Sequence, residues 1–337
     1  MKHKIELGHG SGGLMTGELI NEVFTKILDN RWLKAEGDSA VFKSEKEHIA
    51  FTTDSYVITP MFFPGGDLGK LAVCGTVNDL AVAGARPAYL TAGFILEEGL
   101  SLDVLQKIVE SMKKEADKAG VNVVAGDTKV VKKGQADGMY INTSGIGFVD
   151  NKFSGLAEGK LIRKGDVLLV NGSLGDHEAA IINARESLFE TSPLISDCAS
   201  LNGMIGSLLE QCSSVRFMRD ITRGGLAGIL QEIADMTNQG VEIREEWLPF
   251  SDPVTAFCET LGYEPLHFAN EGKCILVVSP EEADKALALM QAHEHGRNAA
   301  RIGEITAEHP GRIVMETSVG GNRIIESPMT EKVPRIC

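Results

Sequence analysis

The sequence predicts an α/β protein built from two units, and three observations lead to this class. The chain has 337 residues, which is long for one core and suits two domains. Its 43% hydrophobic and 24% charged residues are ordinary for a globular protein. Strand-like and helix-like segments alternate on both sides of a polar, glycine-bearing stretch at 150–166. We therefore expect domains at 1–150 and 151–327, each a mixed sheet with packed helices, followed by a mobile tail at 328–337.

The first half begins with a glycine-rich segment and continues with strands and helices in turn. Apolar residues at helical spacing predict a helix within 14–30. Small apolar residues fill 68–85, which predicts a helix buried on all sides, whereas 102–120 predicts an amphipathic helix closed by Gly120. Enrichment in β-branched and aromatic residues predicts strands at 39–42, 48–58, 88–96, 121–131 and 139–149.

The second half has a similar mixture of elements and comparable size. Helical spacing predicts helices at 176–188, 198–212, 225–236, 252–262 and 281–293. Short apolar runs predict strands at 167–172, 273–278, 299–306 and 312–316, with a further segment at 241–246.

Charge and cysteine content exclude several classes of function. A net charge of −14 argues against sequence-independent binding to nucleic acid or anionic membranes. No apolar run reaches 18 residues, so we expect no membrane span. None of the six cysteines forms a C-x-x-C pair, which argues against a zinc site and fits reduced thiols in the cytoplasm.

Two glycine-rich motifs bear on nucleotide binding. Gly8, Gly10 and Gly13 satisfy G-x-G-x-x-G, but only "IEL" precedes them, whereas a dinucleotide fingerprint follows a buried strand. "PGGDLGKL" lacks the first glycine and the Ser/Thr of a P-loop. The N-terminal glycines can still hold a phosphate through free backbone amides, so we include Gly10, Gly12 and Gly13 as candidate nucleotide contacts.

Aspartates recur at predicted strand ends and helix starts. Each alone is a typical turn or helix-capping residue. Together, in a chain without a P-loop, they suit a site where carboxylates hold Mg²⁺ against a polyphosphate. The sequence "TRGG" at 222–225 opens a helix and adds amides for phosphate. The recurring residues are Asp38, Asp54, Asp79, Asp127, Asp176 and Asp220.

Several of these motifs resemble one superfamily. "TTDS", "VNDLAVAGA", "GDT" and "RDITRGG" are similar to the aminoimidazole-ribonucleotide synthetase (PurM-like) superfamily, whose members phosphorylate amide, selenide or related groups with Mg-ATP. Within it, "HGSGG", "FTTDSYVITPMFFPGG", "GFILEEGL", "GDTKVV", "FANEGK" and the terminal "PRIC" resemble the HypE family of hydrogenase maturation carbamoyl dehydratases. The likeness runs nearly end to end. The stretch 29–48, which contains Asp38, matches the family only loosely.

The resemblance implies a PurM-like fold and a specific reaction. A carbamoyl group on the Cys337 thiol would be dehydrated to a thiocyanate with ATP and Mg²⁺, to supply cyanide for the iron of [NiFe]-hydrogenase. Glu271 and Lys129 would face the nucleotide or carbamoyl group, one as base and one stabilising charge, with the assignment open. The implied nucleotide contacts are Gly10, Gly12, Gly13, Asn78, Thr222, Arg223, Gly224 and Gly225, and the implied metal ligands are Asp54, Asp79, Asp220, Asp38 and Asp127. The implied partners are a second copy of the chain, joined through residues before about 150, the carbamoyltransferase HypF and the HypC–HypD scaffold complex.

The terminal position of Cys337 then has a physical reason. A thiol that is loaded at one protein and dehydrated at another site must move, and the residues beyond Pro328 span at most about 30 Å when extended. Pro328 and Pro334 stiffen this arm, and Arg335 partly offsets the α-carboxylate beside the thiol.

Other interpretations of the motifs are open. Selenophosphate synthetases carry a reactive Cys or selenocysteine in the N-terminal glycine-rich segment, but here no cysteine precedes Cys74. A non-enzymatic thiol carrier would need neither the aspartates nor "TRGG". His9 and His177 suit phosphate or proton-transfer contacts and equally suit ordinary structural roles.

Overall fold

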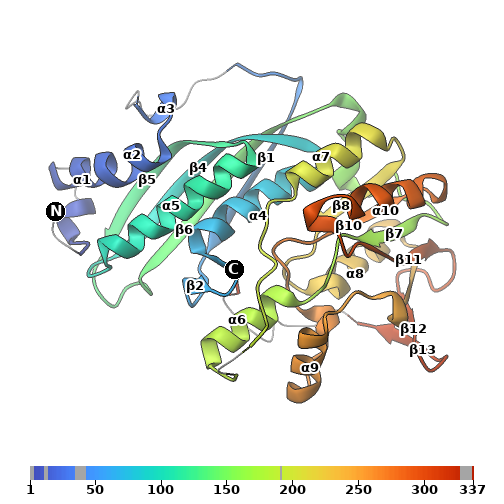
Figure 1. The fold of residues 1–337 in the computed structure, drawn as a ribbon. Coiled ribbons are helices and arrows are strands. Elements are labelled where there is room, and N and C mark those ends of the chain that lie inside the picture. Colours follow the sequence, from blue (N-terminus) through green and yellow to red (C-terminus); the bar gives the residue numbers. More distant parts are fainter. Residues whose placement is uncertain (1–3, 11–13, 35–42, 190–191, 327–335) are drawn as a thin grey trace.

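The computed structural model describes residues 4–10, 14–34, 43–189, 192–326 and 336–337. Within them, one sheet of four strands and one of seven lie in successive halves of the chain, and helices pack on both (Figure 1). A two-stranded sheet, β2 (Phe62–Phe63) with β3 (Gly66–Asp67), lies just before the first long helix. The predicted α/β class is confirmed.

The N-terminal sheet has the strand order β1-β6-β4-β5. Its pairs are antiparallel except for β4 with β5, which run parallel across the helix that joins them. All four strands lie where the sequence predicts strands. They are β1 (His48–Tyr56), β4 (Ala85–Glu97), β5 (Asn122–Val131) and β6 (Met139–Val149). The strand predicted at 39–42 lies outside the described residues.

Two helices, α4 (Leu68–Val82) and α5 (Leu102–Ala119), lie on one face of this sheet (Figure 1). All residues of α4 except Lys70 and Asp79 are buried, as expected for a helix made of small apolar residues. The opposite sheet face has no such cover among the described residues and exposes Ile49, Phe51 and Ile95. The N-terminal sheet is therefore packed on one side and open on the other.

The helix predicted within 14–30 is present but irregular. It comprises α1 (Leu14–Leu19), the π-helical turn η2 (Ile20–Thr25) and α2 (Lys26–Leu28). A 3₁₀ turn, η1 (Leu7–Gly10), precedes it and the short helix α3 (Arg31–Lys34) follows.

The C-terminal sheet has the order β13-β12-β9-β11-β7-β10-β8. The strand β8, which ends at Asp220, and the edge strand β13 were missed from the sequence, because each is short and lacks a clean alternation of apolar and polar residues. The strands are β7 (Val167–Val170), β8 (Val215–Asp220), β9 (Gly240–Arg244), β10 (Cys274–Val278), β11 (Ala300–Thr306), β12 (Ile313–Glu316) and β13 (Asn322–Ile325).

All five helices predicted in this half are present, with shifted ends. The helix predicted from residue 198 begins only at Asn202, so the residues before it are free to form a loop that reaches the site described below. The helices are α6 (Asp176–Glu186), α7 (Asn202–Gln211), α8 (Gly225–Thr237), α9 (Asp252–Leu261) and α10 (Ala283–Gln291).

A shared core joins the two halves. Leu80, Ala81 and Val82, at the end of α4, pack in one cluster with residues of α7, β8 and β10. Because α4 contacts strands of both sheets, Asp79 near its end lies at the junction of the halves. Among the described residues, no helix is long and apolar enough to span a bilayer.

Candidate active site

The last residue of the chain lies in a cavity of about 390 Å³ at the junction of the two halves. Its walls come from β1, α4, the turn after β8, the loop before β10 and the end of the chain. The lining residues are Thr53, Asp54, Ser55, Tyr56, Val57, Gly75, Asp79, Asp220, Thr222, Arg223, Glu271, Ile336 and Cys337. Seven of the predicted site residues thus line one cavity, although they come from segments far apart in the sequence.

Alternation along β1 directs Thr52, Asp54 and Tyr56 toward α4. Thr52 donates a hydrogen bond of 2.7 Å to the Asp79 carboxylate, and the Tyr56 hydroxyl lies 3.4 Å from Asp54 Oδ2. Gly75 is needed on α4, because a Cβ there would lie 2.2 Å from the Tyr56 hydroxyl. The absence of a side chain at Gly75 therefore admits the tyrosine ring and keeps this wall of the cavity open.

Three carboxyl groups of the cavity, those of Asp79, Asp220 and Glu271, have raised pKa values. Burial, followed by repulsion from Asp220 and Asp54, raises the pKa of Asp79 to about 8. Burial also raises the pKa of Asp220 to about 6. The pKa of Glu271 is raised well above its usual range, first by burial and then by Asp197 and Asp220. A cation bound among these groups would relieve the cost of ionising them.

The donor set fits a hard divalent cation held together with phosphate. Asp54, Asp79 and Asp220 offer carboxylate oxygens to one cavity. Mg²⁺ is bound in such sites by one or two carboxylates, substrate phosphates and water. Among the described residues, no group of three potential ligands is arranged to hold a metal ion by itself. A cation here would therefore complete its coordination from a nucleotide or from solvent.

The turn "TRGG" places the start of α8 at the cavity. Gly224 and Gly225 have φ angles of +79° and +60°, a region that favours glycine. A Cβ on Gly225 would also lie within 2.7 Å of backbone atoms of residues 266–268. The tight turn brings Thr222 and Arg223 to the cavity wall and leaves the first amides of α8 without a side-chain cap.

Asn78, predicted as a nucleotide contact, does not line the cavity. Its amide donates to the backbone oxygens of Ala199 (3.0 Å) and Glu271 (3.2 Å), and its carbonyl accepts from the amide of Leu201 (2.7 Å). The side chain is buried, and its polar atoms are occupied by backbone groups. We therefore correct the interpretation of Asn78 as a nucleotide contact: it ties α4 to the loop before α7 and to Glu271.

A second side chain, that of Asp197, binds the backbone amide of Glu271. Asp197 accepts from the amides of Glu271 (3.1 Å) and Gly272 (3.3 Å) and forms a buried ion pair of 3.0 Å with Lys273. Burial raises the pKa of Asp197, but attraction from Lys273 and His177 and the hydrogen bonds from Glu271 and Lys273 together lower this pKa below its usual value. Neither Asp197 nor Lys273 was found from the sequence, since no local pattern separates them from surface charges.

The chain terminus is docked by backbone hydrogen bonds. The amide of Val57 donates to the terminal carbonyl oxygen of Cys337 at 3.0 Å, and His177 Nε2 lies 3.0 Å from the carbonyl oxygen of Ile336. Ile336 is buried and Cys337 is half-buried, whereas the other five cysteines are buried. Cys337 is thus the most accessible thiol of the six, and it faces the same cavity as Glu271.

Three of the predicted site residues lie together outside the Cys337 cavity. Gly10, Asp127 and Lys129 line a separate cavity of about 260 Å³ between the N-terminal helices and β5, where Lys129 pairs with Asp127 at 2.7 Å. The register places Asp127 three strands from Ser55, about 14 Å away. Asp127 therefore does not share one metal ion with Asp54 within a chain. The predicted residues Gly12, Gly13 and Asp38 lie outside the described residues.

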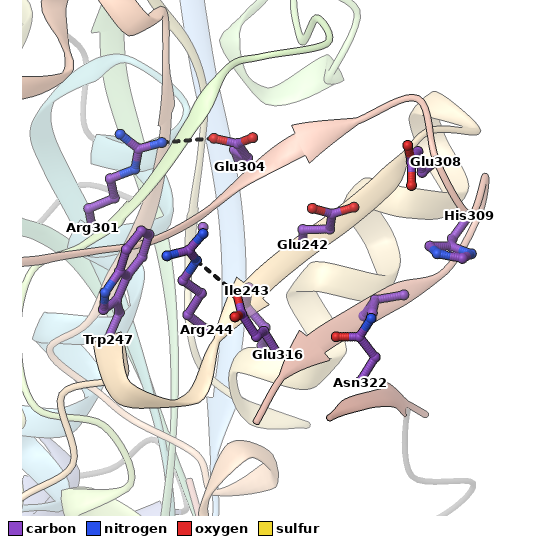
Figure 2. A pocket seen from close by; sticks show the side chains of 12 residues that line it. Glu242, Ile243, Arg244, Trp247, Arg301, Glu304, Glu308, His309, Glu316 and Asn322 are labelled. Atoms are coloured by element: carbon purple, nitrogen blue, oxygen red, sulfur yellow. Dashed lines mark hydrogen bonds and ion pairs between the residues drawn. The ribbon is translucent and has the colours of Figure 1, made fainter. Parts of the chain in front are cut away.

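A larger cavity, of about 490 Å³, lies on the outer face of the C-terminal sheet (Figure 2). It is rich in charge, but Arg244 pairs with Glu316 at 3.1 Å and Arg301 with Glu304 at 2.8 Å, beside Trp247. We name it the outer groove. Both of its arginines are therefore paired with carboxylates.

Known proteins are similar to this chain over most of its length. The family model for the N-terminal domain of AIR synthase related proteins matches residues 36–149, and that for their C-terminal domain matches residues 163–316. The chain is 46% identical over 333 residues to the carbamoyl dehydratase HypE of Azotobacter vinelandii, covering 99% of this chain and 97% of that protein.

Two solved structures are also similar over nearly the whole chain. A hydrogenase maturation protein HypE in complex with ATP has a TM-score of 0.93 and 44% identity, covering 98% of this chain and 99% of the other. HypE in a HypE–HypF complex has a TM-score of 0.80 and 45% identity, covering 92% and 99%. From the identity, the coverage and the matched domains together, the chain belongs to the HypE family of carbamoyl dehydratases, within the AIR synthase related proteins.

Proposed function

We propose that this protein dehydrates a carbamoyl group carried on the Cys337 thiol to a thiocyanate, using ATP, and so supplies cyanide ligands for a hydrogenase iron centre. One observation carries the proposal: the terminal thiol lines the same cavity as Glu271 and three carboxylates suited to Mg-ATP. The family supports the same reaction, and a relative binds ATP.

ATP accepts the oxygen that the dehydration removes, because this oxygen leaves as part of phosphate. The oxygen of the thiocarbamate, R–S–C(=O)NH₂, attacks the γ-phosphorus of ATP, and the bond to ADP breaks. The amide oxygen then leaves as phosphate while nitrogen loses both protons and forms C≡N. The products are R–S–C≡N, ADP, phosphate and a proton. Phosphorylation converts a poor leaving group into a good one, and loss of the two protons requires a base.

Glu271 is the proposed base. Its buried carboxyl group, with a raised pKa, binds a proton tightly once it is ionised. Asp54, Asp79 and Asp220 would hold Mg²⁺, which neutralises charge on the phosphoryl group. Thr222, Arg223 and the amides of Gly224 and Gly225 would contact phosphate oxygens at the start of α8. The docked chain end would exclude water from the cavity, since Ile336 is buried.

We further propose a homodimer formed through the open face of the N-terminal sheet. Phe51 is 70% exposed there and Ile49 is 50% exposed, and single large apolar side chains of this kind on one uncovered face suit an interface. A partner on this face would cover Asp127 and Lys129. Their proposed roles, as metal ligand and stabilising charge, therefore depend on the dimer. Phe51→Asp should give a monomer by light scattering at micromolar concentration, and an unchanged dimer would contradict this interface.

The remaining partners follow from the family. We propose that HypF loads the carbamoyl group, since a 45% identical relative forms a HypE–HypF complex, and that a HypC–HypD complex receives the cyanide. The six free thiols suit a reducing compartment, and we propose a cytoplasmic location.

The decisive experiment measures ATP turnover by the carbamoylated protein. Incubation with ATP and Mg²⁺ should release phosphate and reduce the mass of the modified Cys337 by one water, with the unmodified protein as control. A thiol carrier without catalytic function would give neither change. A kinase of the selenophosphate type would consume ATP without dehydrating the carbamoyl group. Either result would overturn the proposal.

A further inference from the structure

The His177 side chain connects the body of the protein to the chain end by a hydrogen bond. His177 is the second residue of α6 and is fully buried. Its Nε2 lies 3.0 Å from the carbonyl oxygen of Ile336, and its Nδ1 lies 2.7 Å from the Ser196 hydroxyl. The ring also packs edge-on against Phe63, with centroids 5.6 Å apart. Both ring nitrogens are thus used, one of them on the tail.

The partners determine where the protons lie. A carbonyl oxygen only accepts, so Nε2 carries a hydrogen and donates it to Ile336. The neutral ring then accepts at Nδ1 from the Ser196 hydroxyl, whose oxygen accepts from the amide of Cys198 at 3.1 Å. Burial lowers the pKa of His177 and favours this neutral form. A one-way chain of hydrogen bonds therefore runs from the Cys198 amide to the Ile336 carbonyl.

We propose that His177, oriented by Ser196, is a positioning residue that docks the C-terminal dipeptide and sets the depth of the Cys337 thiol in the cavity. It does not touch the reacting atoms. With the Val57 amide on the Cys337 terminal oxygen, it fixes two consecutive carbonyl groups of the tail from opposite sides of the junction, α6 and the end of β1. Two such bonds determine the direction as well as the position of the last residue.

The same loop links the tail to the base. Ser196 orients His177, and the adjacent Asp197 holds the backbone of Glu271. The loop is itself anchored, since the amide of Ser196 donates to the oxygen of Pro64 at 2.8 Å. The distance between the thiol and Glu271 therefore depends on one short segment. This consequence for catalysis rests on the proposed function, whereas docking of the tail does not.

The test measures docking with the unmodified full-length chain. A carboxypeptidase removes residues only from an extended, accessible C-terminus, so the rate of release of Cys337 reports the undocked fraction. His177→Phe keeps the ring volume and the contact with Phe63 but removes both hydrogen bonds. We expect release of Cys337 to become three- to tenfold faster, roughly the effect of one buried hydrogen bond.

Three further variants separate docking from general damage. His177→Gln keeps a donor near the position of Nε2 and should stay within about twofold of the wild type. Ser196→Ala should raise the rate by less than His177→Phe, and the double variant should not exceed His177→Phe alone. His293→Phe, the same change at a histidine distant from the tail, should leave the rate unchanged. Circular dichroism melting curves confirm that each variant is folded.

The rate of thiocyanate formation and the KM for ATP distinguish a change in tail position from a simple loss of stability. For carbamoylated His177→Phe at saturating ATP, thiocyanate formation should fall three- to tenfold while KM for ATP stays the same. An unchanged release rate in folded His177→Phe, or an equal rise in His293→Phe, would overturn the proposal. If the wild type forms no thiocyanate, the proposed function fails, and the carboxypeptidase rates still decide whether His177 docks the tail.

Discussion

The Cys337 cavity and the outer groove are both concave and charged, but their charged side chains are arranged differently. In the outer groove each arginine named above is paired, Arg244 with Glu316 and Arg301 with Glu304. In the Cys337 cavity, Asp54, Asp79 and Asp220 lie together, and burial followed by repulsion between carboxylates raises the pKa values of Asp79 and Asp220. The groove is the larger of the two, about 490 Å³ against about 390 Å³.

The difference shows that cavity size is a poor guide to the site in this protein. Paired surface charges are nearly neutral in energy and leave little to offer a ligand. Like charges held together are unfavourable unless something binds them, and such arrangements are concentrated at functional sites. The comparison predicts large effects of substitution around Cys337 and small ones in the outer groove.

The largest expected effect is complete loss of thiocyanate formation in Cys337→Ser. A serine oxygen cannot carry the product as a thiocyanate, whereas the fold and ATP binding should be unaffected because the side chains are nearly the same size. Mass spectrometry after loading and incubation with ATP measures the outcome. Trp247→Ala in the outer groove is the control and should retain activity.

Asp79→Asn should reduce ATP turnover by roughly a thousandfold, because it removes a carboxylate from the proposed Mg²⁺ site. Stability should change in the other direction. The carboxyl group is protonated in the folded protein up to about pH 8, but the unfolded chain loses that proton from about pH 4. Its contribution to stability therefore falls as pH rises between these values.

Removing that carboxyl group should flatten the pH dependence. In metal-free buffer, denaturant unfolding of Asp79→Asn should give a free energy about 1–3 kcal/mol higher than wild type at pH 7 and a similar value at pH 4. A variant that is active, or less stable at pH 7 than wild type, would contradict the assignment of Asp79.

Two glycines added after Cys337 should slow dehydration by about a hundredfold while loading by the carbamoyl donor survives. The extension keeps the thiol but moves the terminal carboxylate from the Val57 amide, and a displacement of ~1 Å in a closed site can have this effect. Loading and dehydration rates are measured separately by mass spectrometry. Equal loss of both steps would indicate general damage to the tail, and loss of neither would show that the terminal position is dispensable.

Asn78→Ala should lower kcat by about tenfold through the Glu271 backbone, with little change in KM for ATP. It leaves the oxygens of Ala199 and Glu271 without their donor and should also destabilise the fold by about 1–3 kcal/mol. Combined with Glu271→Gln, it should add almost no further loss of kcat, because both changes act on one group. Fully additive losses would show that Asn78 acts independently of Glu271.

The smallest effect is expected for Arg244→Ala in the outer groove. This arginine pairs with Glu316 and stacks on Trp247 at 4.4 Å, both at the surface. Such contacts are worth about 0.5–1 kcal/mol in total. The urea midpoint should shift slightly and ATP turnover should not change. A severalfold loss of turnover would reverse the comparison and make the outer groove part of the function.

Much of the site was predictable because its residues lie next to recognisable elements. Asp54 lies near the end of a strand of clear alternation, and "TRGG" opens a helix of clear periodicity. Asn78 was predicted as a nucleotide contact because the segment "VNDLAVAGA" resembles the superfamily. Consecutive residues on a helix point in directions about 100° apart, so Asp79 faces the cavity while Asn78 faces the loop before α7.

By itself, the sequence determined the α/β class, most of the helices and strands, the terminal thiol and the aspartates, because these depend on local periodicity and residue chemistry. Only the tertiary structure decided which of them meet. Pairing of β5 beside β4 carries Asp127 about 14 Å from Ser55, a separation that no local pattern encodes. Because α7 begins only at Asn202, Ser196 and Asp197 lie in a loop, where they bind His177 and the Glu271 backbone. Such convergence arises from packing between distant segments, and single-sequence patterns do not report it.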